Sequence, residues 1–170
     1  LRRQIQHDLP RSAAAVTDLG HPASVGELAE HLRLALDAAG LGTFRWDKVT
    51  GDVVWDDRME ELFGFAPGTF DGSFESYLAA IHPEDRETTM ATVQTAMRTG
   101  APHRVEHRVV LPDGTVRWIS GAGRPILDDA GVPCGAIGCS RDNTETVSRR
   151  LEQEAAAEAA TPPPTVDVSL

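Results

Sequence analysis

The sequence predicts an α+β domain in which five antiparallel strands form one sheet and short helices cross one of its faces. The main observation is a run of three strand-like stretches over residues 102–143. Turns at residues 111–114 and 128–131 join them, and Asp-Gly at a turn favours a hairpin because both central residues reach φ > 0. The second observation is a shorter hairpin at residues 43–55, followed by three helical segments with apolar faces.

The segment ahead of the first hairpin contains a linker and a helix. Residues 1–22 mix charge, Ala, Pro and Gly without periodicity, which predicts a linker. Ser24 and Glu27 form a capping box and Gly40 is a typical helix end, so an N-terminal flanking helix is expected within residues 23–41. Its apolar stripe consists of Val25, Leu28, Leu32, Ala35 and Ala39.

Aromatic and β-branched residues favour strands at 43–46 and 52–55. Of the three helical segments that follow, the first ends at Gly64, the second is capped by Ser73, and the third begins at Pro83. Their inward-facing residues are expected to be Met59, Leu62 and Phe63, then Phe74, Tyr77, Leu78 and Ile81, and finally Val93 and Met97.

The first of the three C-terminal strands alternates between two faces. One face carries Val105, His107, Val109 and Leu111, and the other carries Arg104, Glu106 and Arg108. Of the two histidines on this strand, His103 and His107, only His107 is assigned to the apolar face. Glu106 and Arg108 are expected to be exposed and to pair with cross-strand neighbours such as Arg117.

Composition and charge argue against several classes of protein. The chain has 170 residues and a formal charge of −10, which fits one domain with extensions and argues against a nucleic-acid interface. No apolar run approaches the roughly 18 residues of a membrane span, and no secretory signal opens the sequence. Cys134 and Cys139 are expected on opposite faces of one strand, as reduced thiols in a cytoplasmic protein. The missing initiator Met suggests a piece of a longer protein or a processed one.

Four segments in this order resemble a PAS domain with its C-terminal PAC segment: GTFRWDKVTGDVVWDDRMEELFGF, IHPEDR, VEHRVVLPDGTVRWISGAGRPILDDAGVP and GCSRDNTE. The resemblance covers about residues 36–145, and we assign residues 42–145 to the domain. It implies the sheet order 2-1-5-4-3, helices over one face, and a cytoplasmic sensing or interaction module. Such modules are usually fused to a kinase, phosphatase, cyclase or transcription factor, as in two-component signalling.

The exit from the last strand departs from the family pattern. The family often has Asp-Ile-Thr there, and this chain has Asp142-Asn143-Thr144, so packing at the exit is expected to be looser. A signalling helix is expected over residues 146–160, before a Pro-rich tail at residues 161–170. The expected signal-relay residues are Asp142, Thr144, Val147 and Leu151. Since Glu154 and Glu158 interrupt a heptad pattern, this helix is either a narrow contact surface or a solvated spacer.

The resemblance implies a ligand space between the sheet and the helices. The candidate lining residues are Phe44, Phe63, Phe74, Leu78, Val93, Met97, His107, Val109 and Trp118. The alternative is that the same residues form an ordinary filled core.

The residues give little support for a cofactor or for catalysis. Haem-binding relatives take an axial His from the long helix, which has none here, and a reactive Cys in a helical motif for covalent flavin is absent. His103 and His107 lie about 13 Å apart on an extended strand, too far for one metal ion. The acidic residues at 56–61 are expected to be a solvated helix start. No phosphate-binding loop or nucleophile motif is present, so the chain is not expected to be an enzyme.

The sequence therefore predicts a sensory PAS module of a bacterial signalling protein. It would sense a small molecule or partner and pass a conformational change through its C-terminal helix. The alternative is a ligand-free interaction or dimerisation module with a filled core. The amphipathic N-terminal helix suggests a homodimer, and an effector domain is the expected partner.

Overall fold

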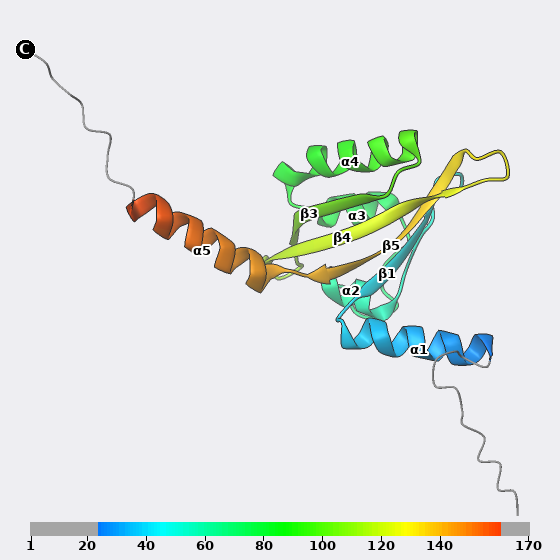
Figure 1. Ribbon diagram of the computed structural model, residues 1–170, viewed down its shortest axis with the longest axis horizontal. Coiled ribbons are helices and arrows are strands. Elements are labelled where there is room, and N and C mark those ends of the chain that lie inside the picture. Colours follow the sequence, from blue (N-terminus) through cyan, green and yellow to red (C-terminus); the bar gives the residue numbers. More distant parts are fainter. Residues whose placement is uncertain (1–23, 161–170) are drawn as a thin grey trace, which may run out of the picture. The chain divides into compact units, whose positions relative to one another are not determined.

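A computed structural model describes residues 24–160. Five strands form one antiparallel sheet in the order β2-β1-β5-β4-β3 (Figure 1). This confirms both the predicted fold class and the strand order that the resemblance implied. The strands are β1 (Gly42–Asp47), β2 (Val53–Trp55), β3 (His103–Val110), β4 (Val116–Leu127) and β5 (Pro133–Asp142).

The helices between β2 and β3 pack on one face of this sheet (Figure 1). The helical elements are α1 (Val25–Ala38), α2 (Asp57–Leu62), α3 (Phe74–Ala80), η1 (Pro83–Asp85), α4 (Arg86–Thr99) and α5 (Thr144–Ala160). The predicted third helix begins as the 3₁₀ turn η1 and continues as α4, which ends at Gly100 with φ of 72°. The predicted linker at residues 1–22 and the tail at residues 161–170 lie outside the described residues.

Helix α1 begins and ends as its capping signals predict. The Ser24 Oγ accepts a hydrogen bond from the Glu27 N–H at 3.2 Å. Gly40, with φ of 64°, allows the chain to leave the helix, and the Leu41 N–H donates to the Leu36 carbonyl. No helix among the described residues is long and apolar enough to cross a membrane.

Two of the four acidic residues around α2, Asp56 and Glu60, are structural, which corrects the expectation of a solvated helix start for them, whereas Asp57 and Glu61 are exposed as expected. Asp56 caps α2 by accepting from the Met59 N–H, and its other oxygen accepts from both the N–H and the hydroxyl of Thr43. Glu60 is 6% exposed and accepts from the N–H groups of Gly68 and Phe70. These carboxylates therefore attach the helix to β1 and order the loop that follows it.

The core lies between the sheet and these helices in two clusters. The larger one joins α2 to β3 and β4, and consists of Met59, Leu62, Phe63, Val109 and Ile119. The smaller one joins α4 to β5 and consists of Val93, Met97 and Ala136. Phe44 of β1 packs against both clusters, and the space around its ring is where the core is incompletely filled.

Candidate functional site

An internal cavity of about 50 Å³ lies between the sheet and helices α2, α3 and α4. Aromatic rings form much of its wall, from Phe44 and Trp46 on β1 to Phe74 and Tyr77 on α3. The rest of the lining is Val53, Trp55, Met59, Phe63, Val93, His103, Val105, His107, Gly121, Ala122, Ala136 and Ser140. The volume suffices for a few water molecules or a very small ligand, and is well below the roughly 300 Å³ of a typical cofactor site.

The ring of Phe44 lies directly on the backbone of the two central strands. Gly138 on β5 makes this approach possible, since a Cβ there would come within 2.7 Å of the Phe44 ring and would also meet the Ala122 carbonyl. A Cβ at Gly123 on β4 would likewise come within 3.2 Å of the same ring. Small residues therefore determine both the position of this ring and the room left beside it.

Three side chains around the cavity have buried polar atoms without a hydrogen-bond partner in the structure. They are the Trp46 Nε1, the His103 Nδ1 and both ring nitrogens of His107. Buried polar atoms are nearly always paired, because desolvation without a partner costs about 1–3 kcal/mol. All three side chains belong to the lining of this cavity.

His107 is the most deeply buried of the three, with 2% of its surface exposed. Burial lowers the pKa of His107 from 6.5 to about 4, and the charge of Asp85 opposes this only in part. The imidazole is therefore neutral at pH 7, with one nitrogen as a donor and the other as an acceptor. Burial also lowers the pKa of His103.

The structure corrects the assignment of the two histidines to different faces. Alternation along β3 places His103, Val105 and His107 on the same side, and all three line the cavity. The lining thus takes both histidines from β3 and Trp46 from β1, on the other side of β4 and β5.

Five predicted pocket residues lie on the cavity, and four do not. The five are Phe44, Phe63, Phe74, Val93 and His107. Val109 is fully buried in the larger core cluster, and Met97 packs in the smaller one beside Val93. Leu78 is half-buried on α3 and is not part of the lining, which Phe74 and Tyr77 of the same helix reach instead.

Trp118 is on the wrong face of the sheet for the predicted role. It lies opposite Arg108 in the β3–β4 register, with the Arg108 guanidinium 5.6 Å from its ring centre. Conversely, the prediction missed Trp46, Trp55 and Tyr77. Alternation from Phe44 to Trp46 was a signal for the first, whereas Trp55 required the pairing of β1 with β2.

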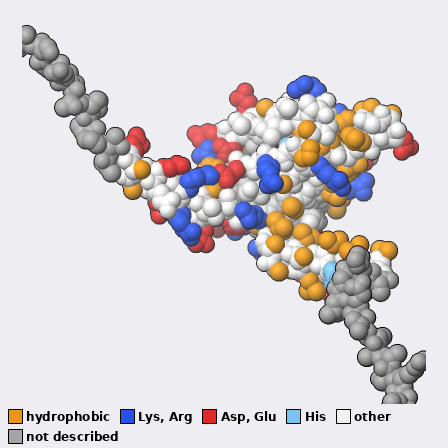
Figure 2. Space-filling model, in the orientation of Figure 1, with side chains coloured by type: hydrophobic (Ala, Val, Ile, Leu, Met, Phe, Trp, Pro, Cys, Tyr) orange, Lys and Arg blue, Asp and Glu red, His pale blue; other side chains and the backbone are white. Residues whose placement is uncertain are grey.

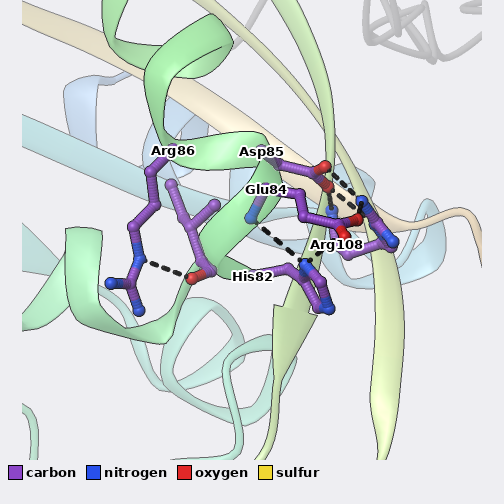
Figure 3. Close-up of polar contacts among 6 residues, drawn as sticks. His82, Glu84, Asp85, Arg86 and Arg108 are labelled. Carbon is purple, nitrogen blue, oxygen red and sulfur yellow. Dashed lines mark hydrogen bonds and ion pairs between the residues drawn. The ribbon is translucent and has the colours of Figure 1, made fainter.

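A polar cluster joins the start of α4 to β3 next to the cavity (Figure 3). The Asp85 carboxylate accepts from the backbone N–H of Arg108 at 2.8 Å, from its Nε at 3.0 Å and from its Nη2 at 2.6 Å. These hydrogen bonds hold the pKa of Asp85 below its usual value and raise that of Arg108. Glu84 adds a bond to the same guanidinium, and the His82 Nδ1 accepts from the Glu84 N–H.

The exit from β5 to α5 is fixed by hydrogen bonds to β4. The Thr144 Oγ1 accepts from the Trp118 N–H at 2.9 Å, and the Asp142 carboxylate lies 3.2 Å from the Arg117 Nε. The Asp142 side chain also accepts from the Thr144 N–H, which begins α5. Two of the predicted relay residues, Asp142 and Thr144, therefore contact the neighbouring strand β4.

Asn143 makes this exit tighter than expected, not looser. It is 9% exposed, its N–H donates to the Trp118 carbonyl, and its Nδ2 donates to Glu106 Oε2 at 3.0 Å. The other Glu106 oxygen accepts from the Arg150 Nη2 of α5 at 2.6 Å. Glu106 thus pairs with α5 and Arg108 with Asp85, so the expected pairing of either residue with Arg117 was wrong.

The two remaining relay residues have different surroundings. Val147 is fully buried, so the first turn of α5 packs onto the domain. Leu151, one turn later, is 48% exposed, and every residue from 151 to 159 is exposed. The helix is therefore anchored at its first two turns and presents its distal half to solvent.

The lining does not fit the groups that haem or flavin photochemistry would need. Cys139 is on the face of β5 opposite Ala136 and Ser140, and the Cys134 Sγ donates to the Ile126 carbonyl, so neither thiol reaches the cavity. The neutral His107 could ligate a metal, but the space beside it is too small for a macrocycle unless the aromatic wall moves. Across residues 24–160, no three His, Cys, Asp or Glu side chains are grouped to hold a metal ion.

The model of the PAS fold family matches residues 52–140. With the strand order and the helices on one face, this shows that the chain belongs to the PAS family. Among solved structures, a sensory box histidine kinase/response regulator from Burkholderia thailandensis superposes with a TM-score of 0.67 at 23% identity, covering 76% of this chain and 96% of that one. That likeness concerns the fold.

Two curated relatives are similar over most of the domain. The probable diguanylate cyclase DgcE of Escherichia coli is 27% identical over 119 residues, and the sensor protein FixL of Bradyrhizobium diazoefficiens is 28% identical over 117 residues. These alignments cover 70% and 69% of this chain, but only 11% and 23% of the relatives. The chain therefore corresponds to one module of much longer proteins.

Proposed function

We propose that this chain is a sensory module of a signal-transduction protein that binds a small polar molecule in the internal cavity. The observation that carries this proposal is the set of unpaired buried nitrogens on Trp46, His103 and His107. The molecule would hydrogen-bond to a neutral imidazole, which offers one donor and one acceptor nitrogen. The relatives, a sensor protein and a probable cyclase, support a role in signalling.

Three consecutive residues of β3 supply a route from the cavity to the rest of the domain. His107 lines the cavity, Glu106 on the opposite face holds Asn143 and Arg150, and Arg108 holds Asp85 at the start of α4. A ligand that moves His107 therefore displaces the residues that fix α4 and α5. We propose that the response leaves through α5 toward an effector such as a kinase or cyclase.

The second candidate is an interaction module whose core is filled in every state. The small volume of the cavity favours it, because a few rotamer changes of the aromatic wall would close the space. In either case we propose that the domain itself has no catalytic activity, and that neither haem nor covalently bound flavin occupies it.

The indole N–H resonance of Trp46 distinguishes the two candidates. We expect acetamide, a small molecule with a donor and an acceptor, to shift this resonance saturably in ¹⁵N–¹H NMR spectra, and His107→Leu to abolish the shift. His31→Leu, on exposed α1, is the matched control. If the Trp46 resonance does not respond while native mass spectrometry shows the bare chain mass, the filled-core module is the correct function.

Asn143→Ala tests the proposed route into α5. Loss of the amide removes its bond to Glu106, and we expect about 1–2 kcal/mol less stability together with roughly tenfold faster hydrogen exchange in the first turns of α5. Arg149→Ala is the control, because Arg149 pairs with Glu145 within α5. Equal exchange in α5 of both variants would contradict the role assigned to Asn143.

A further inference from the structure

A groove of about 520 Å³ lies outside the internal cavity, where the end of β1 and the start of α3 meet α4. Its volume is within the roughly 300–1,000 Å³ of small-molecule sites, whereas the cavity is far below that range. The floor of the groove is apolar and consists of Trp46, Phe74, Met90, Val93 and Met97. Trp46, Phe74 and Val93 also line the cavity, so these three side chains form a wall with the cavity on one side and the groove on the other.

The floor combines two aromatic rings with flexible thioether side chains. The rings of Trp46 and Phe74 have their centres 5.0 Å apart, and Met90 is half-buried like both of them. Val93 and Met97 are each 9% exposed and belong to the smaller core cluster, which supports the floor from below. Methionine adapts its shape to a neighbour, and its sulfur makes favourable contacts with aromatic rings. The floor therefore suits a small aromatic molecule.

The rim of the groove is positively charged although the chain has a net charge of −10. Lys48 and Arg98 line the groove, both are exposed, and neither has an ion-pair partner within residues 24–160. Gln94, one turn before Arg98 on α4, adds an amide, and no Asp or Glu is among the lining residues. In Figure 2, basic side chains (blue) lie over the body of the domain and acidic ones (red) are frequent around α5. The groove therefore offers two free cations beside an apolar floor.

We propose that this groove binds a small aromatic carboxylic acid. The ring of the acid lies on the apolar floor, and its carboxylate lies between the side chains of Lys48 and Arg98. This site is separate from the cavity, and its occupancy does not require a ligand there. Because the wall is shared, an acid that moves the ring of Trp46 or Phe74 changes the room available inside the cavity.

Two other classes of occupant fit this groove less well. Met97 and Arg98 belong to the last turn of α4, and the C-terminal end of a helix carries a partial negative charge. A single carboxylate is therefore favoured over the double charge of a phosphate ester. A stable protein–protein interface buries about 800 Å² on each partner, which a floor of five side chains does not provide.

Methyl NMR of the full 170-residue chain tests both the place and the chemistry of binding. The chain has three methionines, of which Met59 lines the cavity and Met90 and Met97 line the groove. With ¹³C-methyl-labelled methionine, we expect 1-naphthaleneacetate to shift the Met90 and Met97 signals saturably. The neutral 1-naphthaleneacetamide has the same rings and is expected to bind at least about fivefold more weakly. Salt at about 1 M, which shortens the screening length to about 3 Å, should weaken binding of the acid relative to that of the amide.

A double variant, Lys48→Gln with Arg98→Gln, removes both cations of the rim. We expect it to bind the acid about tenfold more weakly than the wild type and to bind the amide equally well. Arg104→Gln with Arg141→Gln is the matched control, because it removes two exposed arginines that do not line the groove. This control is expected to bind the acid like the wild type. Circular dichroism establishes that every variant is folded.

The groove and the cavity can fail independently in these experiments. Met90 and Met97 signals that do not move at about 5 mM acid overturn the groove site, as does equal binding of the acid by the double variant and the wild type. Tighter binding of 1-naphthyl phosphate than of the acid overturns the carboxylate as the head group. A shift of Met59 alone also overturns the groove site, but supports a ligand in the cavity. Shifts of Met90 and Met97 in a chain whose Trp46 indole does not respond to acetamide support the groove site and count against the cavity ligand.

Discussion

The free energy of unfolding of this domain is expected to fall by about 3 kcal/mol as the pH is lowered from 6.5 to 4, and His107→Leu is expected to remove most of that fall. The folded-state pKa of His107 is about 4, against 6.5 for a solvated imidazole, because burial disfavours the charged form. The unfolded chain therefore takes up a proton at a higher pH than the folded chain does. The full stability is present above pH 6.5, decreases between 6.5 and 4, and decreases no further through this group below 4.

Urea unfolding at a series of pH values measures this dependence directly. Leucine has a similar volume but no titrating group. The unfolding free energy of the variant should therefore fall less between pH 6.5 and 4 than that of the wild type, whatever its value at pH 7. His31→Leu, on exposed α1, is the control that should keep the wild-type slope. A smaller slope should remain in His107→Leu, since burial also lowers the pKa of His103. An unchanged slope would mean that His107 is solvated or paired in the folded state.

A cavity ligand and this acid sensitivity involve the same atoms. A molecule that accepts a hydrogen bond from the imidazole and donates one to it binds the neutral form. Such a ligand should extend the fall in stability to below pH 4, because its binding lowers the folded-state pKa of His107 further. The pH profile in the presence of acetamide is therefore a second readout of cavity occupancy.

The fold could be predicted because its signals are local. Turn residues at 111–114 and 128–131 define the three long strands, and Ser73 and Gly100 define helix ends, so element boundaries follow from short stretches of chain. The site was predicted in part. Alternation along a strand is enough to place Phe44 and His107 on the inner face. The same rule places His103, four residues before His107, on that face as well, although the prediction assigned it to the other one.

The remaining features depend on register and on residues far apart in the sequence. The assignment of Trp118 to the pocket was wrong because the face on which it lies follows from its pairing with Arg108. The sequence of a single strand does not reveal that pairing. Glu106 contacts Asn143 and Arg150 across 37 and 44 residues. The alternation of residues along β3 suggested a cross-strand pair for Glu106 instead, because it carries no information on which part of α5 lies beside this strand.

Asp85→Ala is expected to destabilise the domain by about 2 kcal/mol at pH 7, which makes it the second large effect. The carboxylate accepts three hydrogen bonds from Arg108, including one from the backbone N–H of an edge strand. Its removal leaves that N–H and a half-buried guanidinium without their main acceptor, although Glu84 and water compensate in part. Glu84→Ala is the control, and is expected to cost well under about 1 kcal/mol because the Glu84 side chain is 73% exposed.

The pH range of this second effect separates it from that of His107. Hydrogen bonds from Arg108 hold the pKa of Asp85 below its ordinary 3.8, so its contribution is fully present above that pH and is lost as the pH falls through the lower folded-state value. The difference in unfolding free energy between the wild type and Asp85→Ala should thus be nearly constant from pH 8 to 5. A difference that instead grows between pH 6.5 and 4 would show that Asp85 stabilises the domain mainly through the charge of His107. In that case the link between β3 and α4 would depend on the cavity, not on the Arg108 ion pair.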